Sequence, residues 1–203
     1  VVILSISIVS IFPDFFTGPL GLSIPKRAAE AGLVTYRCVD LRDFTHDKHR
    51  TADDAPFGGG PGMVMTASPV IKAVEKALKV RSARRRLAVI VWFNPSAKQF
   101  TNKDADALTK YTDVVLVCGR YEGIDERAKK ILKTLATVKE FAVGEAVYTG
   151  GEVPALAIVD AVTRRLSGVL GKDASVEERR VASSAVYTRP ETILYKKKKY
   201  KVP

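Results

Sequence analysis

The sequence predicts an α/β fold whose central sheet is largely parallel, buried and flanked by helices. Short and almost continuous apolar runs, such as residues 87–93 and 113–117, are typical of strands with both faces covered. Segments with apolar residues at helical spacing alternate with these runs along the chain. The chain has 203 residues, of which 46% are apolar, so it can form one sizeable core.

The first expected strand covers residues 1–11 and ends where Phe12-Pro13 interrupts strand pairing. A helix over residues 24–31 follows and ends at Gly32, which suits the left-handed conformation of a helix C-terminus. The remaining elements are expected in the order strand 34–41, helix 67–80, strand 87–93, helix 105–111, strand 113–117, helix 124–135, strand 138–143 and helix 154–166.

Two segments fall outside this alternation. Residues 42–62 are rich in Asp, His and Gly, and we expect an irregular loop there. Loops of this length in compact domains are usually functional or mobile. After Gly171 the apolar pattern ends, which predicts a linker.

The charge balance suggests a polyanionic partner. The chain has 33 Lys and Arg residues against 22 Asp and Glu, a net charge of +11 and a pI of about 9.7. Such a balance favours nucleic acid over a membrane surface. Part of the excess lies in residues 84–86 and 196–199. Charge runs are usually solvated faces, so charge alone supports nucleic-acid binding only modestly.

The cysteines, the histidines and the hydropathy indicate the cellular compartment and the kinds of protein that the chain does not resemble. Cys38 and Cys118 are the only cysteines, and their apolar surroundings indicate buried thiols in a reducing cytoplasm. With two histidines in the chain, we do not expect a histidine-rich metal centre. No run reaches the ~18 apolar residues of a membrane span, and the N-terminal segment lacks signal-peptide features. A soluble, cytoplasmic protein is therefore expected.

Glycine-rich or polar segments follow three of the expected strands, at residues 94–96, 119–123 and 144–152. Because the carboxyl ends of parallel strands meet at one edge of a sheet, these loops are expected to form a single ligand pocket. The alternative is that each is an ordinary turn, which is more plausible for Asn94-Pro95 than for residues 144–152. No segment matches the glycine pattern of a dinucleotide site or a P-loop.

The loop over residues 45–63 allows different interpretations. Its His and Asp side chains superficially suggest a metal site, but their spacing matches no familiar motif, so metal binding ranks low. Gly58, Gly59 and Gly60, beside Phe57, would let a phosphate backbone or a base approach the main chain. On composition alone, a solvated surface loop is an equally good interpretation.

Taken together, these motifs resemble the bacterial tRNA (guanine37-N1)-methyltransferase family of the SPOUT superfamily. The similarity covers residues 5–171 almost without gaps. The residues that carry it are 8–13 (IVSIFP), 41–47 (LRDFTHD), 53–63 (DDAPFGGGPGM), 118–127 (CGRYEGIDER), 150–152 (GGE), 168–171 (GVLG) and 187–190 (YTRP).

The resemblance implies an α/β domain whose C-terminal part forms a deep trefoil knot, an arrangement nearly absent from other proteins. It also implies that S-adenosylmethionine is the methyl donor, that guanine 37 of tRNA is the target, and that an obligate homodimer shares its sites between subunits. The implied donor contacts are Asn94, Pro95, Gly119, Tyr121, Gly123, Val143, Gly144, Glu145, Ala146, Val147, Tyr148, Gly150 and Gly151. The implied RNA contacts are Gly58, Gly59, Gly60 and Arg189.

The chemistry requires that the proton on guanine N1 be removed or polarised, which suits a carboxylate base and a cation near O6. The resemblance implies that Glu122 faces the methionine end of the donor and that Arg164 orients the guanine from the partner subunit. The family's catalytic aspartate falls at Arg179, and an arginine cannot act as a general base. Glu178, one residue away, is the substitute we expect.

The resemblance also divides the chain. Residues 1–171 are expected to form the methyltransferase domain, and residues 172–203 an interdomain linker with the truncated start of a C-terminal tRNA-binding domain. Two alternatives stay open. One is a SPOUT methyltransferase of another RNA. The other, suggested by Arg179 and the short C-terminal part, is a non-catalytic donor- or RNA-binding module.

Overall fold

A computed structural model describes residues 3–79, 87–170 and 186–203 of the chain. At its centre lies a five-stranded sheet in the order β2-β1-β6-β5-β7, and every neighbouring pair is parallel. The parallel α/β sheet predicted from the apolar runs is thereby confirmed. The strands are β1 (Leu4–Ser10), β2 (Val34–Asp40), β5 (Ala88–Phe93), β6 (Asp113–Val117) and β7 (Thr137–Phe141).

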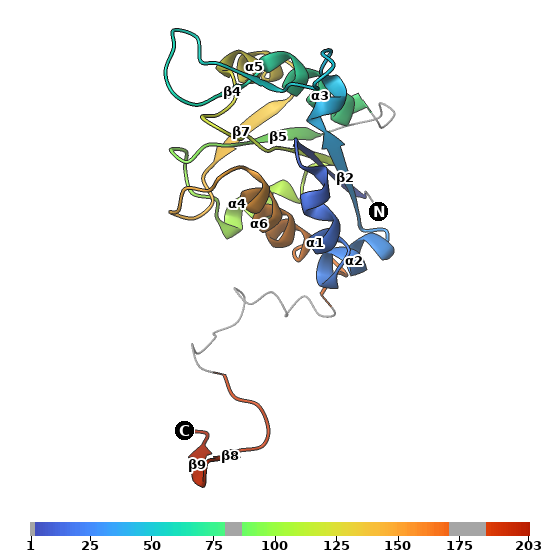
Figure 1. Cartoon of the computed structure of the whole chain (residues 1–203). Helices are drawn as coiled ribbons and strands as arrows, with labels where there is room; N and C mark the ends of the chain where they lie inside the picture. Colours follow the sequence, from blue (N-terminus) through green and yellow to red (C-terminus); the bar gives the residue numbers. More distant parts are fainter. Residues whose placement is uncertain (1–2, 80–86, 171–185) are drawn as a thin grey trace.

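Helices cover both faces of the sheet (Figure 1). On one face lie α3 (Ala67–Lys79) and α5 (Glu126–Leu132), and on the other lie α2 (Ser23–Glu30), α4 (Asn102–Leu108) and α6 (Glu152–Thr163). Successive side chains of a strand point to opposite faces, so β6 contributes to two separate cores. Val114 and Leu116 pack on the side of α6, while Val115 and Val117 pack on the side of α3.

The connection after β1 and the loop after β2 contain regular structure that the sequence did not predict. A 3₁₀ turn, η1 (Pro13–Phe16), runs into the short helix α1 (Thr17–Leu20). A second turn, η2 (Leu41–Phe44), is capped by the Asp40 carboxylate, which accepts a hydrogen bond from the Arg42 amide at 2.8 Å.

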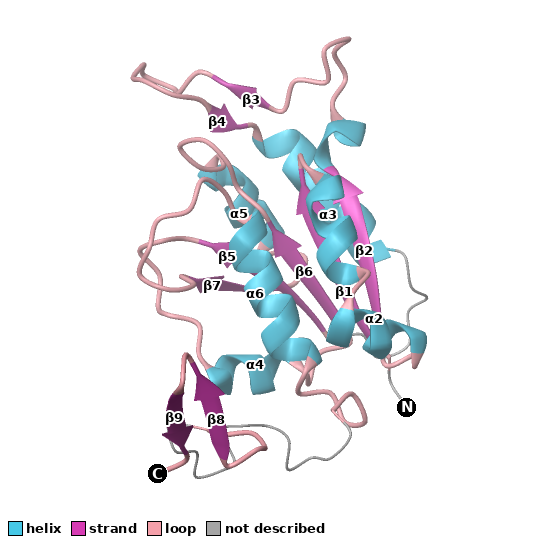
Figure 2. Ribbon diagram, turned by 60° about the horizontal axis from the view of Figure 1, so that its bottom comes forward, coloured by secondary structure: helices cyan, strands magenta, loops and turns pink. Residues whose placement is uncertain are grey.

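The loop expected at residues 42–62 is only partly irregular. Its residues Asp53–Asp54 form β3, which pairs antiparallel with β4 (Val64–Met65) just beyond it, so the glycine-rich residues 58–62 form the tip of a hairpin (Figure 2). The expectation of no regular structure there was wrong, because a pair of two-residue strands leaves no readable alternation in the sequence.

The helix expected at residues 105–111 lies at Asn102–Leu108 instead. A capping box sets its start: the Thr101 side chain accepts from the Asp104 amide, and the Asp104 carboxylate accepts from the Thr101 amide at 3.1 Å. This pattern fixes a helix N-terminus by satisfying two otherwise free amides. The prediction was late by about one turn because it followed the apolar residues and not the cap.

The C-terminal residues 186–203 contain an antiparallel hairpin of β8 (Thr192–Tyr195) and β9 (Lys198–Lys201), which the sequence did not predict. Of the segment expected to be a linker and the start of a further domain, residues 172–203, residues 172–185 lie outside the described residues. Within the described part of the chain, no helix is long and apolar enough to span a membrane.

Candidate ligand site

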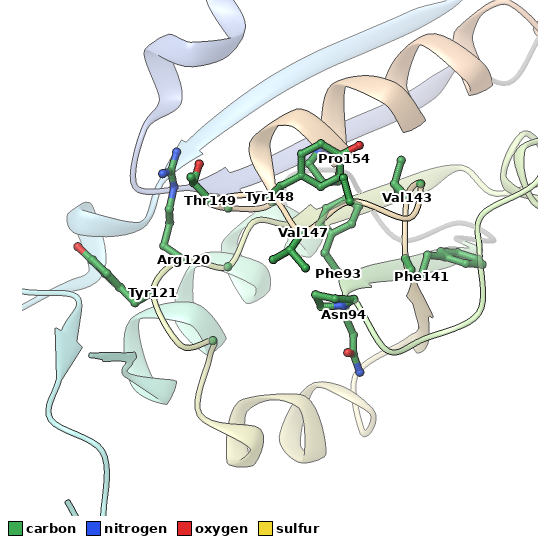
Figure 3. A pocket seen from close by; sticks show the side chains of 18 of the residues that line it. Phe93, Asn94, Arg120, Tyr121, Phe141, Val143, Val147, Tyr148, Thr149 and Pro154 are labelled. Carbon is green, nitrogen blue, oxygen red and sulfur yellow. The ribbon is translucent and has the colours of Figure 1, made fainter. Parts of the chain in front are cut away.

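The carboxyl ends of β5, β6 and β7, which are neighbours in the sheet, surround a cavity of about 200 Å³ (Figure 3). The three loops expected to meet do so there. Of the expected donor contacts, all except Glu145 line the cavity, as does Glu122. The other lining residues are Phe93, Arg120, Phe141, Ala142, Thr149 and Pro154.

The loop after β6 is held in place by the segment around β4. The Glu122 amide donates to the Met63 carbonyl at 3.0 Å, and the Met65 amide donates to the Gly123 carbonyl at 2.9 Å. Tyr121 adopts a positive φ of 58° at the tip of this turn, and its side chain points away from the Val147 side of the cavity (Figure 3). Residues 119–123 therefore have a backbone fixed from outside the cavity.

Glu122 connects this loop to the glycine-rich hairpin tip. A Cβ built on Gly62 would lie 2.5 Å from the Glu122 carboxylate oxygen Oε1, so the carboxylate packs directly against that glycine. Gly62 also has a φ of +82°, a conformation that side chains disfavour. The absence of a side chain at residue 62 is thus what makes room for the carboxylate of Glu122, which lines the cavity.

The loop after β7 runs back from the edge of the sheet to the end of β6. The Gly151 amide donates to the Gly119 carbonyl at 2.9 Å, and Gly150 forms a bridge with Arg120. A Cβ on Gly151 would lie 2.7 Å from the Cys118 Cα, a distance that real Cβ atoms do not show. The two backbones touch here, which closes one side of the cavity.

A buried ion pair ties the same two loops to the first strand. The Glu152 carboxylate is 1% exposed and accepts from Arg120 Nε at 3.0 Å and from Ser10 Oγ at 2.7 Å. The guanidinium of Arg120 also lies over the ring of Phe12, 4.8 Å from its centroid. Glu152 thus connects β1, the loop after β6 and the start of α6 at a single point.

Asn94, at the end of β5, is fixed by its backbone and side chain. Its amide donates to the Phe141 carbonyl at 3.0 Å, and its side-chain Nδ2 donates to Glu140 at 3.3 Å. Glu140 in turn accepts from Lys129 Nζ at 2.9 Å. The hydrogen bond from Lys129 holds the pKa of Glu140 below its usual value, against the opposing effect of burial, and Asn94 adds to this lowering.

Glu140→Gln is expected to destabilise the fold by roughly 1 kcal/mol at pH 7, because Lys129 and Asn94 lose a charged acceptor. A carboxyl group with a lowered pKa stabilises the fold above its unfolded pKa of about 4.3, and this stabilisation disappears as the pH falls through the folded value. Urea unfolding of both proteins at pH 7 and pH 3 should show the difference shrinking in acid. An equal difference at both pH values would contradict this account of Glu140.

Several expected site residues lie away from the cavity. Glu145 belongs to the loop after β7 but does not line the cavity. Gly58, Gly59 and Gly60 occupy the exposed hairpin tip with positive φ, where a Cβ would meet nothing within 4 Å. Arg164 follows the last residue of α6, about 18 Å along the helix from its first turn. Arg189 is exposed in the C-terminal segment, and Glu178 lies outside the described residues.

Two features limit other kinds of chemistry at this site. Burial raises the pKa of the Cys118 thiol well above its ordinary value, so this cysteine beside the cavity stays protonated at neutral pH. Among residues 3–79, 87–170 and 186–203, no group of three or more His, Cys, Asp or Glu side chains is arranged to hold a metal ion.

Arg120, Glu152 and Gln99 are contributors that the sequence interpretation did not assign. Gln99 Nε2 donates to the Gly144 carbonyl at 2.9 Å and so supports the loop after β7. Arg120 and Glu152 stand inside the quoted motifs, so a signal for them existed. Gln99 stands in no such motif, and no sequence signal pointed to it.

A parallel α/β sheet with a ligand cavity at the carboxyl ends of adjacent strands defines a small-molecule-binding domain of the kind that α/β enzymes use. Comparison with known proteins identifies the particular family. The family model described as "tRNA (Guanine-1)-methyltransferase TrmD" matches residues 4–203. The chain belongs to this family, as predicted, and the match extends beyond the expected limit at residue 171 to the end of the chain.

Curated relatives named tRNA (guanine-N(1)-)-methyltransferase agree. The chain is 47% identical to the one from Dictyoglomus turgidum over 175 residues, which are 86% of this chain and 67% of the relative. It is 40% identical to the one from Alkaliphilus oremlandii over 191 residues, or 91% of this chain and 75% of the relative. The Geobacter sp. relative is 44% identical over 187 residues, covering 90% and 72%.

Proposed function

We propose that the chain transfers a methyl group from S-adenosylmethionine to N1 of guanine 37 in tRNA. The observation that carries the proposal is the cavity, because the residues that the family resemblance assigns to the donor come from three separate loops and, except for Glu145, line one space. Membership of the tRNA (guanine-N1)-methyltransferase family supports the reaction and the RNA class of the substrate. A tRNA substrate also supports the cytoplasm as the site of action.

The cavity suits a compact nucleoside-containing donor. Its wall includes Phe93, Val147, Tyr148 and Pro154, which give apolar surfaces for a purine ring. Its glycine-rich loops expose backbone groups that can hydrogen-bond to a ribose or an amino acid. When bound, S-adenosylmethionine supplies an electrophilic methyl group. We propose that the carboxylate of Glu122, a residue that lines the cavity, meets a positively charged part of the donor.

The position of Arg164 supports a shared site in a homodimer. The N-terminus of α6 borders the cavity, whereas Arg164 lies about 18 Å away at the other end of the helix, farther than its side chain reaches. We propose that Arg164 acts at the cavity of a second copy, where its charge stabilises the negative charge that develops on guanine O6. The N1 proton would pass to Glu178, a role assigned from the sequence alone.

The path of the chain after β7 supports a trefoil knot. From the edge strand the chain returns over the sheet to contact the end of β6 at Gly119, and then enters α6, which packs beside α2 and α4. We propose that the segment between β7 and α6 passes through a loop of the chain and so forms the trefoil knot that the family resemblance implies. Residues 1–171 would then be the methyltransferase domain, and residues 172–203 a linker and the start of a tRNA-binding part.

Ala146→Trp is expected to abolish donor binding, because Ala146 lines the cavity and an indole there would fill it. We expect the unchanged chain to bind S-adenosylmethionine with a dissociation constant of roughly 1–100 μM. Calorimetry measures both. Glu145→Trp is the matched control, since it places the same bulk one residue away, outside the cavity lining, and it should bind almost normally.

Methyl transfer to a tRNA transcript with guanine 37 tests the reaction, with an adenine 37 transcript as the substrate control. Product with the first transcript alone supports the proposal. Modification of another RNA, found by mapping methylated positions, would favour the alternative enzyme. Donor binding without product would favour a non-catalytic module. Normal product from Glu178→Gln would remove Glu178 as the base.

A further inference from the structure

The hairpin of β8 and β9, residues 192–201, carries aromatic side chains on one of its faces. Ile193 lies opposite Tyr200, and Tyr195 lies opposite Lys198, so these four side chains share one face. Every one of these residues is exposed; Ile193 and Tyr195 are each 59% exposed, and Tyr200 is 51% exposed. We call residues 192–201 the lysine hairpin. It presents aromatic rings to the solvent and does not bury them in a core.

The same segment concentrates positive charge. Residues 186–203 contain six basic residues and one acidic residue, which account for five of the eleven net positive charges of the chain. Lys196 and Lys198 lie over the rings of Tyr195 and Tyr200, each 5.5 Å from the centroid. A cation–π contact leaves the ammonium group able to donate hydrogen bonds outward. The lysine hairpin therefore combines stacking surfaces with accessible cations.

The turn of the lysine hairpin has positively charged residues at positions where the backbone conformation favours other residue types. Its two central residues, Lys196 and Lys197, both have positive φ, 46° and 63°. Two-residue hairpin turns of this kind favour Asn-Gly, because a left-handed conformation costs most other residues roughly 1–2 kcal/mol each. With lysine at both positions, the turn is less stable than an Asn-Gly turn would be, but it carries two ammonium groups at its tip. Backbone strain of this kind is a marker of functional sites.

We propose that the lysine hairpin binds the phosphate backbone of the tRNA substrate, with its tyrosines stacking on unpaired bases. This inference rests on the proposed function for the identity of the RNA. Lysines supply the point charges that neutralise phosphates and release counterions, and exposed tyrosines supply the stacking surfaces typical of single-stranded RNA contacts. The contact is independent of guanine 37, since neither phosphates nor stacking identify a base.

The test compares the full chain with the double variant Lys196→Asn, Lys197→Gly. This change removes two charges but installs the residues that the turn geometry favours, so folding should be preserved. Lys196→Arg, Lys197→Arg keeps the charge and is the matched control. Fluorescence anisotropy with a labelled tRNA transcript would be recorded between 50 and 300 mM NaCl, and donor binding by calorimetry would be measured in parallel.

The Asn-Gly variant should bind tRNA at least about tenfold more weakly near 0.1 M salt, with a log–log salt slope smaller by roughly 1.4–1.8. The loss should be the same for guanine 37 and adenine 37 transcripts, and donor affinity should not change. An unchanged affinity for tRNA and an unchanged salt slope would overturn the proposal. A chain that binds tRNA through the lysine hairpin but never methylates it would refute the proposed function alone.

Discussion

Gly151→Ala is expected to destabilise the chain by about 3 kcal/mol and to weaken donor binding by at least tenfold. The added Cβ would lie 2.7 Å from the Cys118 Cα and 3.1 Å from the Gly119 amide nitrogen. Both are backbone atoms of a strand end in the middle of the sheet, so no side-chain rotation relieves the contact. Overpacking of a rigid core typically costs about 1–3 kcal/mol, and the upper end applies where backbones must separate.

The effect on the donor follows from the position of the contact. Gly119, Gly150 and Gly151 all line the cavity, so separating the two loops changes the shape of the ligand site itself. Urea unfolding and calorimetry with S-adenosylmethionine measure the two effects. Gly18→Ala is the matched control, because Gly18 lies in α1 with nothing within 4 Å of its Cβ position. A Gly151→Ala protein that matched the Gly18→Ala protein in both assays would contradict the close approach.

The sequence predicted the sheet and its three binding loops because both depend on local patterns. Continuous apolar runs such as Asp113–Val117 indicate buried parallel strands, and parallel strands bring their following loops to one edge. The strand order β2-β1-β6-β5-β7 was not predictable in this way, because β1 and β6 pair across more than 100 residues of chain and the register carries no local signal.

The C-terminal hairpin was missed for a different physical reason. Its lysines resemble a solvated charge run in the sequence, and Ile193 and Tyr195 are exposed, so they contribute to no core pattern. The turn also lacks the Asn or Gly that usually indicates a positive φ. The hydrogen bonds of Glu152 also could not be predicted from local sequence patterns. Its partner Arg120 lies 32 residues away and Ser10 lies 142 residues away, so only the folded chain brings them together.

Glu152→Ala is expected to cost about 3–5 kcal/mol of stability, the range for breaking a buried ion pair by removing one partner. The carboxylate is 1% exposed, and its loss would leave the largely buried Arg120 guanidinium and the fully buried Ser10 hydroxyl without their acceptor. Glu30→Ala is the control, since Glu30 forms an exposed ion pair with Lys26 at 3.8 Å. Such pairs are worth at most ~1 kcal/mol.

Glu152→Gln separates charge from shape. The amide of glutamine can still accept from Arg120, and its NH₂ group can donate to Ser10 Oγ in place of the bond that Ser10 now donates. Two hydrogen bonds therefore remain while the ionic part is lost, and the expected cost falls to roughly 1.5–3 kcal/mol. Donor affinity should follow the same order, unchanged protein, then glutamine, then alanine, because Arg120 lines the cavity and is held by this carboxylate. If Glu152→Gln and Glu152→Ala lowered stability and donor affinity equally, the charge of Glu152, and not the geometry of its hydrogen bonds, would hold the loops after β6 and β7 together. If both bound donor normally, the ion pair would serve the fold alone, and the cavity would depend on the glycine contact between residues 119 and 151.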